Sequence, residues 1–361
     1  MKLLTLSVRL FSIALFACSS LTVVQAASNP DSPKVDQQLF LPMISRGRPL
    51  VNEVVASFEP AASGSADSFY TPMDATPDAD GNTFYFTAMS DQGAGVFRVP
   101  ATGGTVVTLT LGAPLTMPFG LAINESGQTI YIADTSATSP DAQAASGSVV
   151  TACSGKQGGI FSLPAGGGTP VLVPGTACTA PRGITVMTEN DADMIYFTGV
   201  DPSDNQPAVM KIPASGGSLT LLDKGSPLVD PVGITVASDT RVYVTDQGTD
   251  TVYRIKQGVH STRSSHREAI AKDIRMGSPA GVTLTLDQSN VLVSSLDEST
   301  GTSQVVVINT TTLDQALVNA VISANHASGG LHRAQNSKVM AWCGVTAGTG
   351  GQGIVFRVEL K

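Results

Sequence analysis

Hydrophobic and polar residues alternate along most of the chain after residue 50, in short runs that are separated by turns. In one clear example, an apolar run opens at Pro118, turns at the polar segment 125–127 and returns as a second apolar run that ends at Asp134. Two alternating runs joined by a polar turn predict a β-hairpin. No segment of useful length carries the 3.6-residue periodicity of a helix. The pattern therefore predicts an all-β protein.

Six copies of this hairpin occur along the chain. Four copies open on a proline, any residue and a glycine, and they begin at residues 118, 181, 231 and 279. Two degenerate copies begin at residues 72 and 328. Neighbouring copies lie 46 to 50 residues apart, except for one step of 63 residues. Self-similarity at a fixed spacing is typical of solenoids and propellers, in which each repeat is one structural unit.

A second hairpin follows the first in the repeat. Its turns read Pro-Ala-Thr-Gly-Gly at 100–104, Pro-Ala-Gly-Gly-Gly at 164–168 and Pro-Ala-Ser-Gly-Gly at 213–217. Four strands in about 48 residues form one blade of a β-propeller. We therefore predict one domain over residues 50–361, a six-bladed β-propeller with four-stranded antiparallel blades. The last copy has room for about three strands, so an N-terminal strand over residues 49–58 is expected to complete it and close the ring.

The beginning of the chain has the features of an export signal. Lys2 and Arg9 accompany an apolar run over residues 10–17, and the small residues that end at Ala26 are typical of a signal-peptidase site. We predict a signal peptide over residues 1–26 and export to the periplasm or the extracellular space. Cleavage after Ala26 leaves no transmembrane span in the mature chain.

Two further features belong to this region. Residues 27–49 form a polar, proline-containing lead-in to the domain. The segment that ends at Cys18 reads Leu-Phe-Ala-Cys and resembles a bacterial lipobox. A lipid anchor at Cys18 is therefore the alternative to cleavage after Ala26.

Composition narrows the classes of partner. The chain carries 21 Lys+Arg against 29 Asp+Glu, a formal net charge of −8, and 42% of its residues are hydrophobic. Binding to nucleic acid requires clustered Lys and Arg to neutralise phosphates, and no broad basic face is apparent. We therefore expect a small-molecule or protein ligand, no nucleic acid, and a monomer with a substantial core.

Three cysteines remain after removal of a signal peptide. Cys153 lies in the insertion 136–159 that lengthens one repeat, and Cys178 lies in the loop before Pro181. Propeller topology places both loops on one face, so we predict a Cys153–Cys178 disulfide that is suited to an oxidising compartment. Cys343 lies on an apolar strand and is expected to be a buried free thiol.

Ligand sites in propellers lie around the central channel, on the face where the first strand of each blade begins and the second ends. We call this the channel face. One column of the repeat that maps there follows the opening proline and reads Met73, Phe119, Arg182, Val232, Ala280 and Gly329. The other ends the second strand and reads Ala88, Asp134, Gly199, Asp246, Ser295 and Cys343.

The frame Pro-x-Gly-[Leu/Ile], followed by a strand that ends in Asp134 or Asp246, resembles the NHL-repeat and gluconolactonase/strictosidine-synthase-like six-bladed propellers. The resemblance covers about 290 residues and implies the fold. Propellers of this group include lactonases, lyases, synthases and binding proteins, so it does not decide the activity. It implies that Asp134 and Asp246 match the aspartate column of the family.

The metal-dependent hydrolases of this group carry Pro-Asn-Gly in the first column, and no copy here has that asparagine. A calcium site needs about six oxygen ligands, which Phe119, Arg182 and their aliphatic neighbours in the column do not supply. We therefore expect no cofactor. A divalent cation at Asp134 and Asp246 is the alternative.

Asp134 and Asp246 have two interpretations. An aspartate at the end of the strand commonly accepts hydrogen bonds from backbone amides of a nearby turn, which is a structural role. In a hydrolase the same carboxylates would serve in acid/base chemistry or as metal ligands.

Four other side chains are candidates on the channel face. Arg182 is the only charge in its column and could bind a carboxylate or phosphate, or pair with a neighbouring acid. Phe119 is the aromatic member of the same column, and His326 lies in the loop that opens the last blade. His332 is a candidate acid/base group, or else a hydrogen-bonded or solvated histidine. Its column elsewhere holds Thr185, Thr235 and Thr283.

These residues support two main hypotheses. The first is an exported propeller that binds a ligand or partner protein on its channel face without turnover. The second is a gluconolactonase- or strictosidine-synthase-like hydrolase or lyase, with Asp134 or Asp246 and His332 in acid/base roles. A scaffold in an envelope complex, anchored through a lipid at Cys18, is a third possibility.

Overall fold

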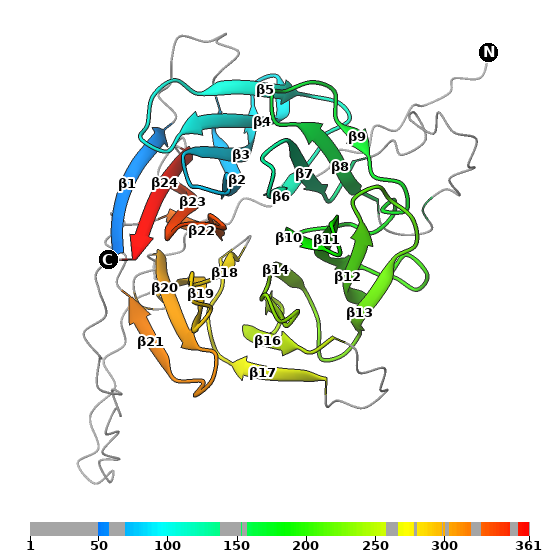
Figure 1. Ribbon diagram of the computed structural model, residues 1–361, viewed down its shortest axis with the longest axis vertical. Helices are drawn as coiled ribbons and strands as arrows, with labels where there is room; N and C mark the ends of the chain where they lie inside the picture. Colours follow the sequence, from blue (N-terminus) through cyan, green and yellow to red (C-terminus); the bar gives the residue numbers. More distant parts are fainter. Residues whose placement is uncertain are drawn as a thin grey trace, which may run out of the picture. The chain divides into compact units, whose positions relative to one another are not determined.

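The structure is a computed structural model that describes residues 50–57, 69–137, 153, 157–257, 266–277, 280–297, 299, 303–318, 326–346 and 353–360. These residues form an all-β propeller of six four-stranded antiparallel sheets, as the repeat predicts (Figure 1). The predicted signal peptide, Cys18, the lead-in and most of the insertion 136–159 lie outside the described residues. Within them, no helix has the length and hydrophobicity needed to cross a membrane.

Each of the first five blades is a continuous segment of chain, with its first strand innermost and its fourth outermost (Figure 1). Blade 1 contains β2 (Thr71–Pro77), β3 (Thr83–Ser90), β4 (Gly93–Pro100) and β5 (Val107–Leu111), and blade 2 contains β6 (Pro118–Ile123), β7 (Thr129–Asp134), β8 (Gly159–Pro164) and β9 (Val171–Leu172). Blade 3 contains β10 (Ile184–Glu189), β11 (Ala192–Val200), β12 (Pro207–Pro213) and β13 (Thr220–Lys224). Blade 4 contains β14 (Pro231–Val236), β15 (Val242–Asp246), β16 (Thr251–Ile255) and β17 (Arg267–Ala271), and blade 5 contains β18 (Val282–Leu284), β19 (Asn290–Leu296), β20 (Ser303–Asn309) and β21 (Gln315–Val318).

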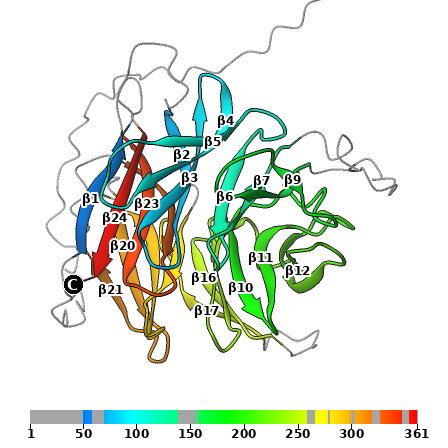
Figure 2. The ribbon, with the colours of Figure 1, turned by 45° about the horizontal axis from the view of Figure 1, so that its top comes forward.

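The sixth blade combines the two ends of the domain. Its inner strands are β22 (His326–Arg333), β23 (Val339–Thr346) and β24 (Gly353–Leu360), and its outermost strand is β1 (Leu50–Ser57). β1 runs antiparallel to β24, with a bulge between Val54 and Ala56 (Figure 2). The first strand of the domain therefore pairs with the last.

The core consists of six apolar layers between neighbouring blades. Phe161 of blade 2 packs in a cluster with Val96 of blade 1, whereas Ile160, next to it on the same strand, packs with Phe197 of blade 3. Both faces of each sheet are thus buried, which explains why the central strands contain continuous apolar runs. Burial on both faces also fixes strand register, because a slip of one residue would exchange the two layers.

The glycine of the Pro-x-Gly frame allows neighbouring blades to approach closely near the axis. A Cβ atom at Gly183 would lie 1.9 Å from the carbonyl oxygen of Val232, and one at Gly233 would lie 2.2 Å from that of Ala280. Distances this short do not occur between real atoms, so the repeat requires glycine where one blade contacts the backbone of the next.

A hydroxyl group connects neighbouring blades beside these glycines. Thr198 accepts a hydrogen bond from the N–H of Gly183 at 2.9 Å and donates one to the carbonyl of Val232 in the next blade at 2.8 Å. Thr245 and Ser294 make the same pair of bonds at the next two joints. Each hydroxyl satisfies a buried N–H and a buried carbonyl at once, which stabilises the joint.

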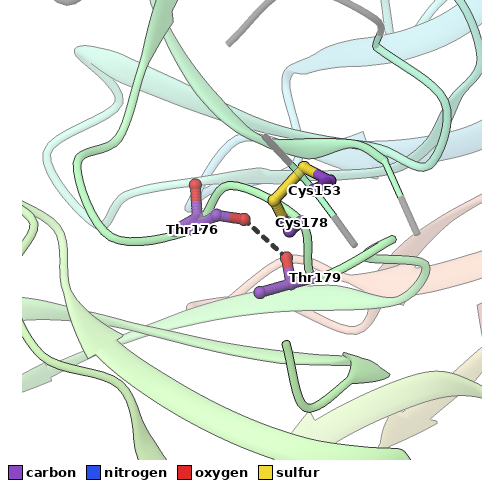
Figure 3. Close-up of a disulfide and its surroundings, with 4 residues drawn as sticks. All are labelled: Cys153, Thr176, Cys178 and Thr179. Atoms are coloured by element: carbon purple, nitrogen blue, oxygen red, sulfur yellow. Dashed lines mark hydrogen bonds between the residues drawn. A yellow bond between two sulfur atoms is a disulfide. The ribbon is translucent and has the colours of Figure 1, made fainter. Parts of the chain in front are cut away.

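The predicted disulfide is confirmed. Cys153 and Cys178 are bonded with a Cα–Cα distance of 5.4 Å (Figure 3). Beside it, the Thr179 hydroxyl donates to the carbonyl of Thr176 at 2.7 Å. Cys343 is a buried free thiol, as expected, and burial raises the pKa of that thiol well above its ordinary value.

Replacing both Cys153 and Cys178 by serine should lower the free energy of unfolding by about 3 kcal/mol, the loop-closure entropy expected for a 25-residue separation. Urea unfolding of the double variant and of the wild type measures the difference. Dithiothreitol should destabilise the wild type by a similar amount and leave the double variant unchanged. An equal loss in both proteins would assign the effect of the reductant to something other than this disulfide.

Candidate functional site

Asp134 lies fully buried at the end of β7, and its carboxylate holds the loop that leads into β6, the first strand of the same blade. It accepts hydrogen bonds from the N–H groups of Thr116 at 2.7 Å, Met117 at 3.0 Å and Ser136 at 3.0 Å. Burial raises the pKa of the Asp134 carboxyl, and the backbone N–H groups partly oppose that shift.

Asp246, at the end of β15, repeats this arrangement in blade 4. Its carboxylate is fully buried and accepts hydrogen bonds from the N–H groups of Val229 at 2.8 Å, Asp230 at 3.2 Å and Thr249 at 3.1 Å. In both blades the carboxylate therefore fixes the loop that leads into the first strand. This is the structural interpretation of the aspartate column, and it leaves little room for a ligand at either carboxylate.

A metal site would need several such groups together. Among the residues that the structure describes, no three histidine, cysteine, aspartate or glutamate side chains are grouped to hold an ion. Asp134 and Asp246 belong to blades 2 and 4, and each is surrounded by N–H donors, which repel a cation. The donor set around each carboxylate therefore does not fit a divalent cation.

His332 lies beside the channel and contacts Asp74, which is not among the predicted site residues. Its Nε2 atom is 3.0 Å from Oδ1 and 3.1 Å from Oδ2 of Asp74. The buried Asp74 carboxylate also accepts hydrogen bonds from the N–H of Ala75 at 2.9 Å and of Leu121 at 2.7 Å. Asp74 on β2 thereby connects blade 1 to blade 6 on one side and to blade 2 on the other.

The pKa of His332 reflects two opposed effects. Burial lowers the pKa of the imidazole, but the charge of Asp74 and the hydrogen bond to it outweigh burial, so the pKa is raised above its ordinary value of 6.5. The imidazolium form is therefore stabilised in the folded protein, which would suit either an ion pair within the ring or a general acid.

The repeat contains a signal that would have identified Asp74. The third column of the frame holds glycine in the other five blades and aspartate only in blade 1. A Cβ atom at Gly330, its counterpart in blade 6, would lie 1.6 Å from Oδ1 of Asp74, so the carboxylate occupies space that glycine provides. A side chain at this position needs partners of its own, and the Asp74 carboxylate has them in the His332 imidazole and the N–H of Leu121.

Arg182 and Phe119 contact each other on the channel face. The Arg182 guanidinium lies 5.1 Å from the centroid of the Phe119 ring and pairs with Asp230 at 2.9 Å. Both partners of the ion pair are partly exposed, so the pair stabilises the fold little and orients the guanidinium. From the sequence, the partner of Arg182 could be a ligand or a neighbouring acid, and the structure pairs it with Asp230.

Beside Arg182 lies a hollow of about 490 Å³ over blades 2, 3 and 4, which we call the channel-face hollow. Thr135, Asn205 and Val229 contribute to its wall, and the Val229 side chain is 58% exposed. The hollow therefore combines the Arg182–Asp230 ion pair, polar groups and an apolar edge, a composition suited to binding.

The predicted site residues fall into separate places. Between Phe119, Arg182 and His332 the channel holds only a small space of about 10 Å³, far smaller than the channel-face hollow. Asp134 and Asp246 lie buried within blades 2 and 4, and the side chain of His326 is outside the described part of the chain. Among the predicted residues whose side chains the structure describes, Arg182 alone borders the channel-face hollow.

Comparison with known proteins supports the fold. No known family matches the sequence, and no curated protein matches it. A gluconolactonase from Xanthomonas campestris superposes with a TM-score of 0.54 at 15% identity, covering 87% of this chain and 96% of that one. A chain of the nidogen/laminin complex gives 0.53 at 15% identity over 79% and 98%, and a putative TolB from Agrobacterium tumefaciens gives 0.50 at 13% identity over 80% and 90%. The resemblance that the repeat predicts is thus confirmed for the six-bladed fold, and proteins of different activities share it.

Proposed function

We propose that this protein is an exported β-propeller that binds a ligand or a partner protein on its channel face, as a monomer and without turnover. The observation that carries the proposal is that Asp134 and Asp246 each have their carboxylate engaged by three backbone N–H groups. Acid/base chemistry needs a group that can reach substrate, and neither carboxylate has a free approach. The channel-face hollow beside Arg182 offers a contact surface instead.

Export is part of the same proposal. The Cys153–Cys178 disulfide is expected of proteins in oxidising compartments. The proposal includes a signal peptide over residues 1–26, a lead-in over 27–49 and a propeller over 50–361. Mass spectrometry of the mature N-terminus tests it, because Ala27 as the first residue without a lipid supports cleavage, whereas a lipid on Cys18 identifies a lipoprotein.

Removal of metal should not affect stability. We expect the melting temperature of the purified protein to change by less than 1 °C between EDTA and added Ca²⁺, Mg²⁺, Mn²⁺ or Zn²⁺, because Asp134 and Asp246 face N–H donors. A ligand that binds only the folded state raises the melting temperature in proportion to its binding free energy. A rise of several degrees that Asp246→Asn abolishes would contradict the proposal and favour a metal-dependent hydrolase.

The channel-face hollow can be tested by charge reversal. Arg182→Glu should abolish or strongly weaken crosslinking of the protein to its partner in extracts of the organism that produces it. The matched control is Arg241→Glu, another partly exposed arginine that is paired to an aspartate, in the first turn of blade 4. Equal loss in both variants, or in neither, would place the binding surface elsewhere.

A hydrolase or lyase is the second candidate, and the Asp74–His332 pair is the observation that favours it. A carboxylate bonded to an imidazole can orient and polarise a general acid or base. Screening lactones and esters with the wild type and with His332→Gln tests this candidate. If the wild type turns over a substrate and His332→Gln does not, although circular dichroism shows that the variant is folded, the binding proposal is wrong and the protein is an enzyme.

A further inference from the structure

The ends of the first strands form a second cavity on the face opposite the channel face. We call it the turn-face cavity, because it is bordered by the residues that enter the first hairpin turn of each blade. Its volume is about 300 Å³. Since antiparallel hairpins place their turns at the end opposite their open ends, this cavity and the channel-face hollow lie at opposite mouths of the channel.

The ionisable residues of its lining are His332, Arg333 and Glu125. Arg333 occupies a position of the repeat that is aliphatic in blades 2 to 5, where the column reads Ile123, Val186, Val236 and Leu284. Blade 6 thus places two consecutive basic side chains where other blades have a threonine or alanine followed by an aliphatic residue. Since His332 is paired with Asp74, Arg333 is the cation that this polar cavity offers to a ligand.

Backbone carbonyls hold the Arg333 guanidinium in place. Its Nε donates to the carbonyl of Leu284 at 2.7 Å, and its Nη1 donates to the carbonyls of Ala334, Gln335 at 2.9 Å and Ser337 at 3.0 Å. Within the described chain, no carboxylate forms an ion pair with Arg333, and its Nη2 has no hydrogen-bond partner. An oriented cation with two unused N–H donors is suited to an oxyanion.

Hydroxyl groups line the wall around this cation. Thr185 and Thr235 line the cavity from blades 3 and 4, and their hydroxyls make no hydrogen bond to another described group. Thr283, their counterpart in blade 5, accepts a hydrogen bond from the N–H of Arg333 at 3.2 Å. The threonine column thus provides hydroxyls that are available to a ligand beside the guanidinium.

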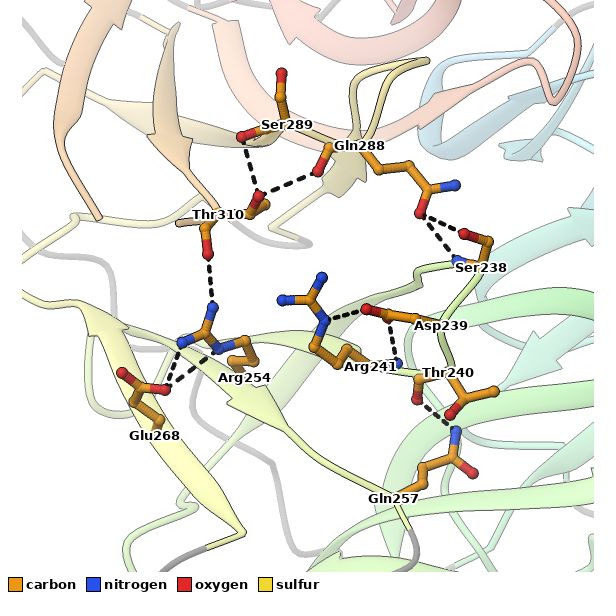
Figure 4. A network of polar contacts seen from close by, with 10 residues as sticks. All are labelled: Ser238, Asp239, Thr240, Arg241, Arg254, Gln257, Glu268, Gln288, Ser289 and Thr310. Atoms are coloured by element: carbon orange, nitrogen blue, oxygen red, sulfur yellow. Dashed lines mark hydrogen bonds and ion pairs between the residues drawn. The ribbon is translucent and has the colours of Figure 1, made fainter. Parts of the chain in front are cut away.

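The rim of the cavity is fixed by bonds between blades. The Gln288 side-chain carbonyl of blade 5 accepts bonds from the N–H and hydroxyl of Ser238 of blade 4, both at 3.0 Å (Figure 4). Asn336 of blade 6 donates to Asp80 of blade 1 at 3.0 Å, and Asn124 of blade 2 donates to Asp193 of blade 3 at 2.9 Å. A rim built this way is preorganised, which lowers the entropy that a ligand loses on binding.

We propose that the turn-face cavity binds a small molecule with a carboxylate or phosphate group. The Arg333 Nη2 donors bind the oxyanion, and the Thr185 and Thr235 hydroxyls bind the polar groups next to it. The exposed Glu125 on the rim disfavours highly charged anions, so the site takes a compact molecule with one or two negative charges. This site is separate from the channel-face hollow of the proposed function.

Isothermal titration calorimetry with inorganic phosphate and with succinate, at constant ionic strength in sodium chloride, tests the proposal. Saturable binding of at least one probe to the wild type at a 1:1 ratio is expected. Thr185→Val combined with Thr235→Val removes two hydroxyls without breaking a bond inside the protein, and it should raise the Kd about tenfold. Arg333→Val should raise the Kd further, to at least about 30-fold, because it removes a charged donor.

The variant Arg182→Gln shows whether the probe binds in the turn-face cavity or in the channel-face hollow. It should leave the Kd unchanged, because Arg182 borders the channel-face hollow. If Arg333→Val fails to fold, the Kd of the threonine double variant decides whether the cavity binds the probe. A melting temperature close to that of the wild type shows that the double variant is folded. Absence of saturable binding to the wild type, an unchanged Kd in the threonine double variant, or loss of binding in Arg182→Gln would each overturn the proposal.

Discussion

Replacing His332 by threonine, the residue of its column in blades 3 to 5, is expected to lower the free energy of unfolding by about 3 kcal/mol. The substitution leaves the buried Asp74 carboxylate without its cationic partner, and breaking one side of a buried ion pair has a cost of this order. Urea unfolding measures the loss. The matched control is His266→Gln, since His266 lies 3.2 Å from Asp223, which keeps Arg267 at 2.7 Å as a second partner. We expect that control to lose less than about 1 kcal/mol.

A second substitution tests the cause of this loss. Asp74 lies opposite Thr87 in the first hairpin of blade 1, and the Thr87 hydroxyl is buried without a hydrogen-bond partner. At the joints of blades 3, 4 and 5 the equivalent hydroxyl bonds to the column glycine and to the next blade. Asp74→Gly therefore allows Thr87 to form that bond pair. The double variant Asp74→Gly/His332→Thr should be more stable than His332→Thr alone, and a double variant less stable than either single variant would refute this explanation.

The same pair makes stability depend on pH. Because the pKa of His332 is raised in the folded state, the stability contributed by the protonated imidazole is fully present below about pH 6.5, the unfolded value, and is lost as the pH rises through the folded pKa. In Asp74→Asn only burial acts on the imidazole, so its pKa should fall below 6.5. The stability difference between wild type and Asp74→Asn should narrow from pH 6 to pH 8. An NMR titration in which His332 has the same pKa in both proteins would contradict this.

The sequence predicts the blades because the same residue type does the same physical work in every copy. Glycine recurs in the third column where a Cβ atom at Gly183 or Gly233 would overlap the next blade, and a hydroxyl recurs at Thr198 and Thr245 beside it. Because each contact between blades imposes the same packing requirement, the same residue type recurs at each one, and one sequence is enough to show the recurrence. The Cys153–Cys178 disulfide was predictable for a related reason, since the repeat places both loops on one face.

The parts of the site that escaped prediction are the single departures from the repeat. Asp74 belongs to a degenerate copy, and its partner His332 is 258 residues away along the chain. Only the closed ring brings blade 6 against blade 1. Arg333 likewise stands out against its aliphatic column, but whether it faces solvent, a carboxylate or a cavity depends on packing that periodicity does not encode. A residue that differs from its equivalents in the other blades can be recognised in the sequence. The group that it contacts in the folded protein cannot.

Replacing Asp246 by alanine is the second large effect that we expect. Three backbone N–H groups, those of Val229, Asp230 and Thr249, lose their acceptor at a fully buried position. Leaving buried donors unsatisfied has a cost of about 1–3 kcal/mol for each group, and water entering the space offsets part of it, so a loss of about 3 kcal/mol is expected. Thermal and urea unfolding measure this loss.

The exposed Asp239 in the first turn of the same blade is the matched control for this loss. Its carboxylate pairs with Arg241 at the surface, so Asp239→Ala should change the free energy of unfolding by less than about 0.5 kcal/mol. Asp246→Asn retains one acceptor oxygen and places its amide N–H groups against backbone donors, which predicts an intermediate loss. If Asp246→Ala melted like the wild type while Asp239→Ala did not, the carboxylate would not be what holds the loop. Asp246 would then be available to a ligand after all, and the hydrolase interpretation would gain the group it lacks.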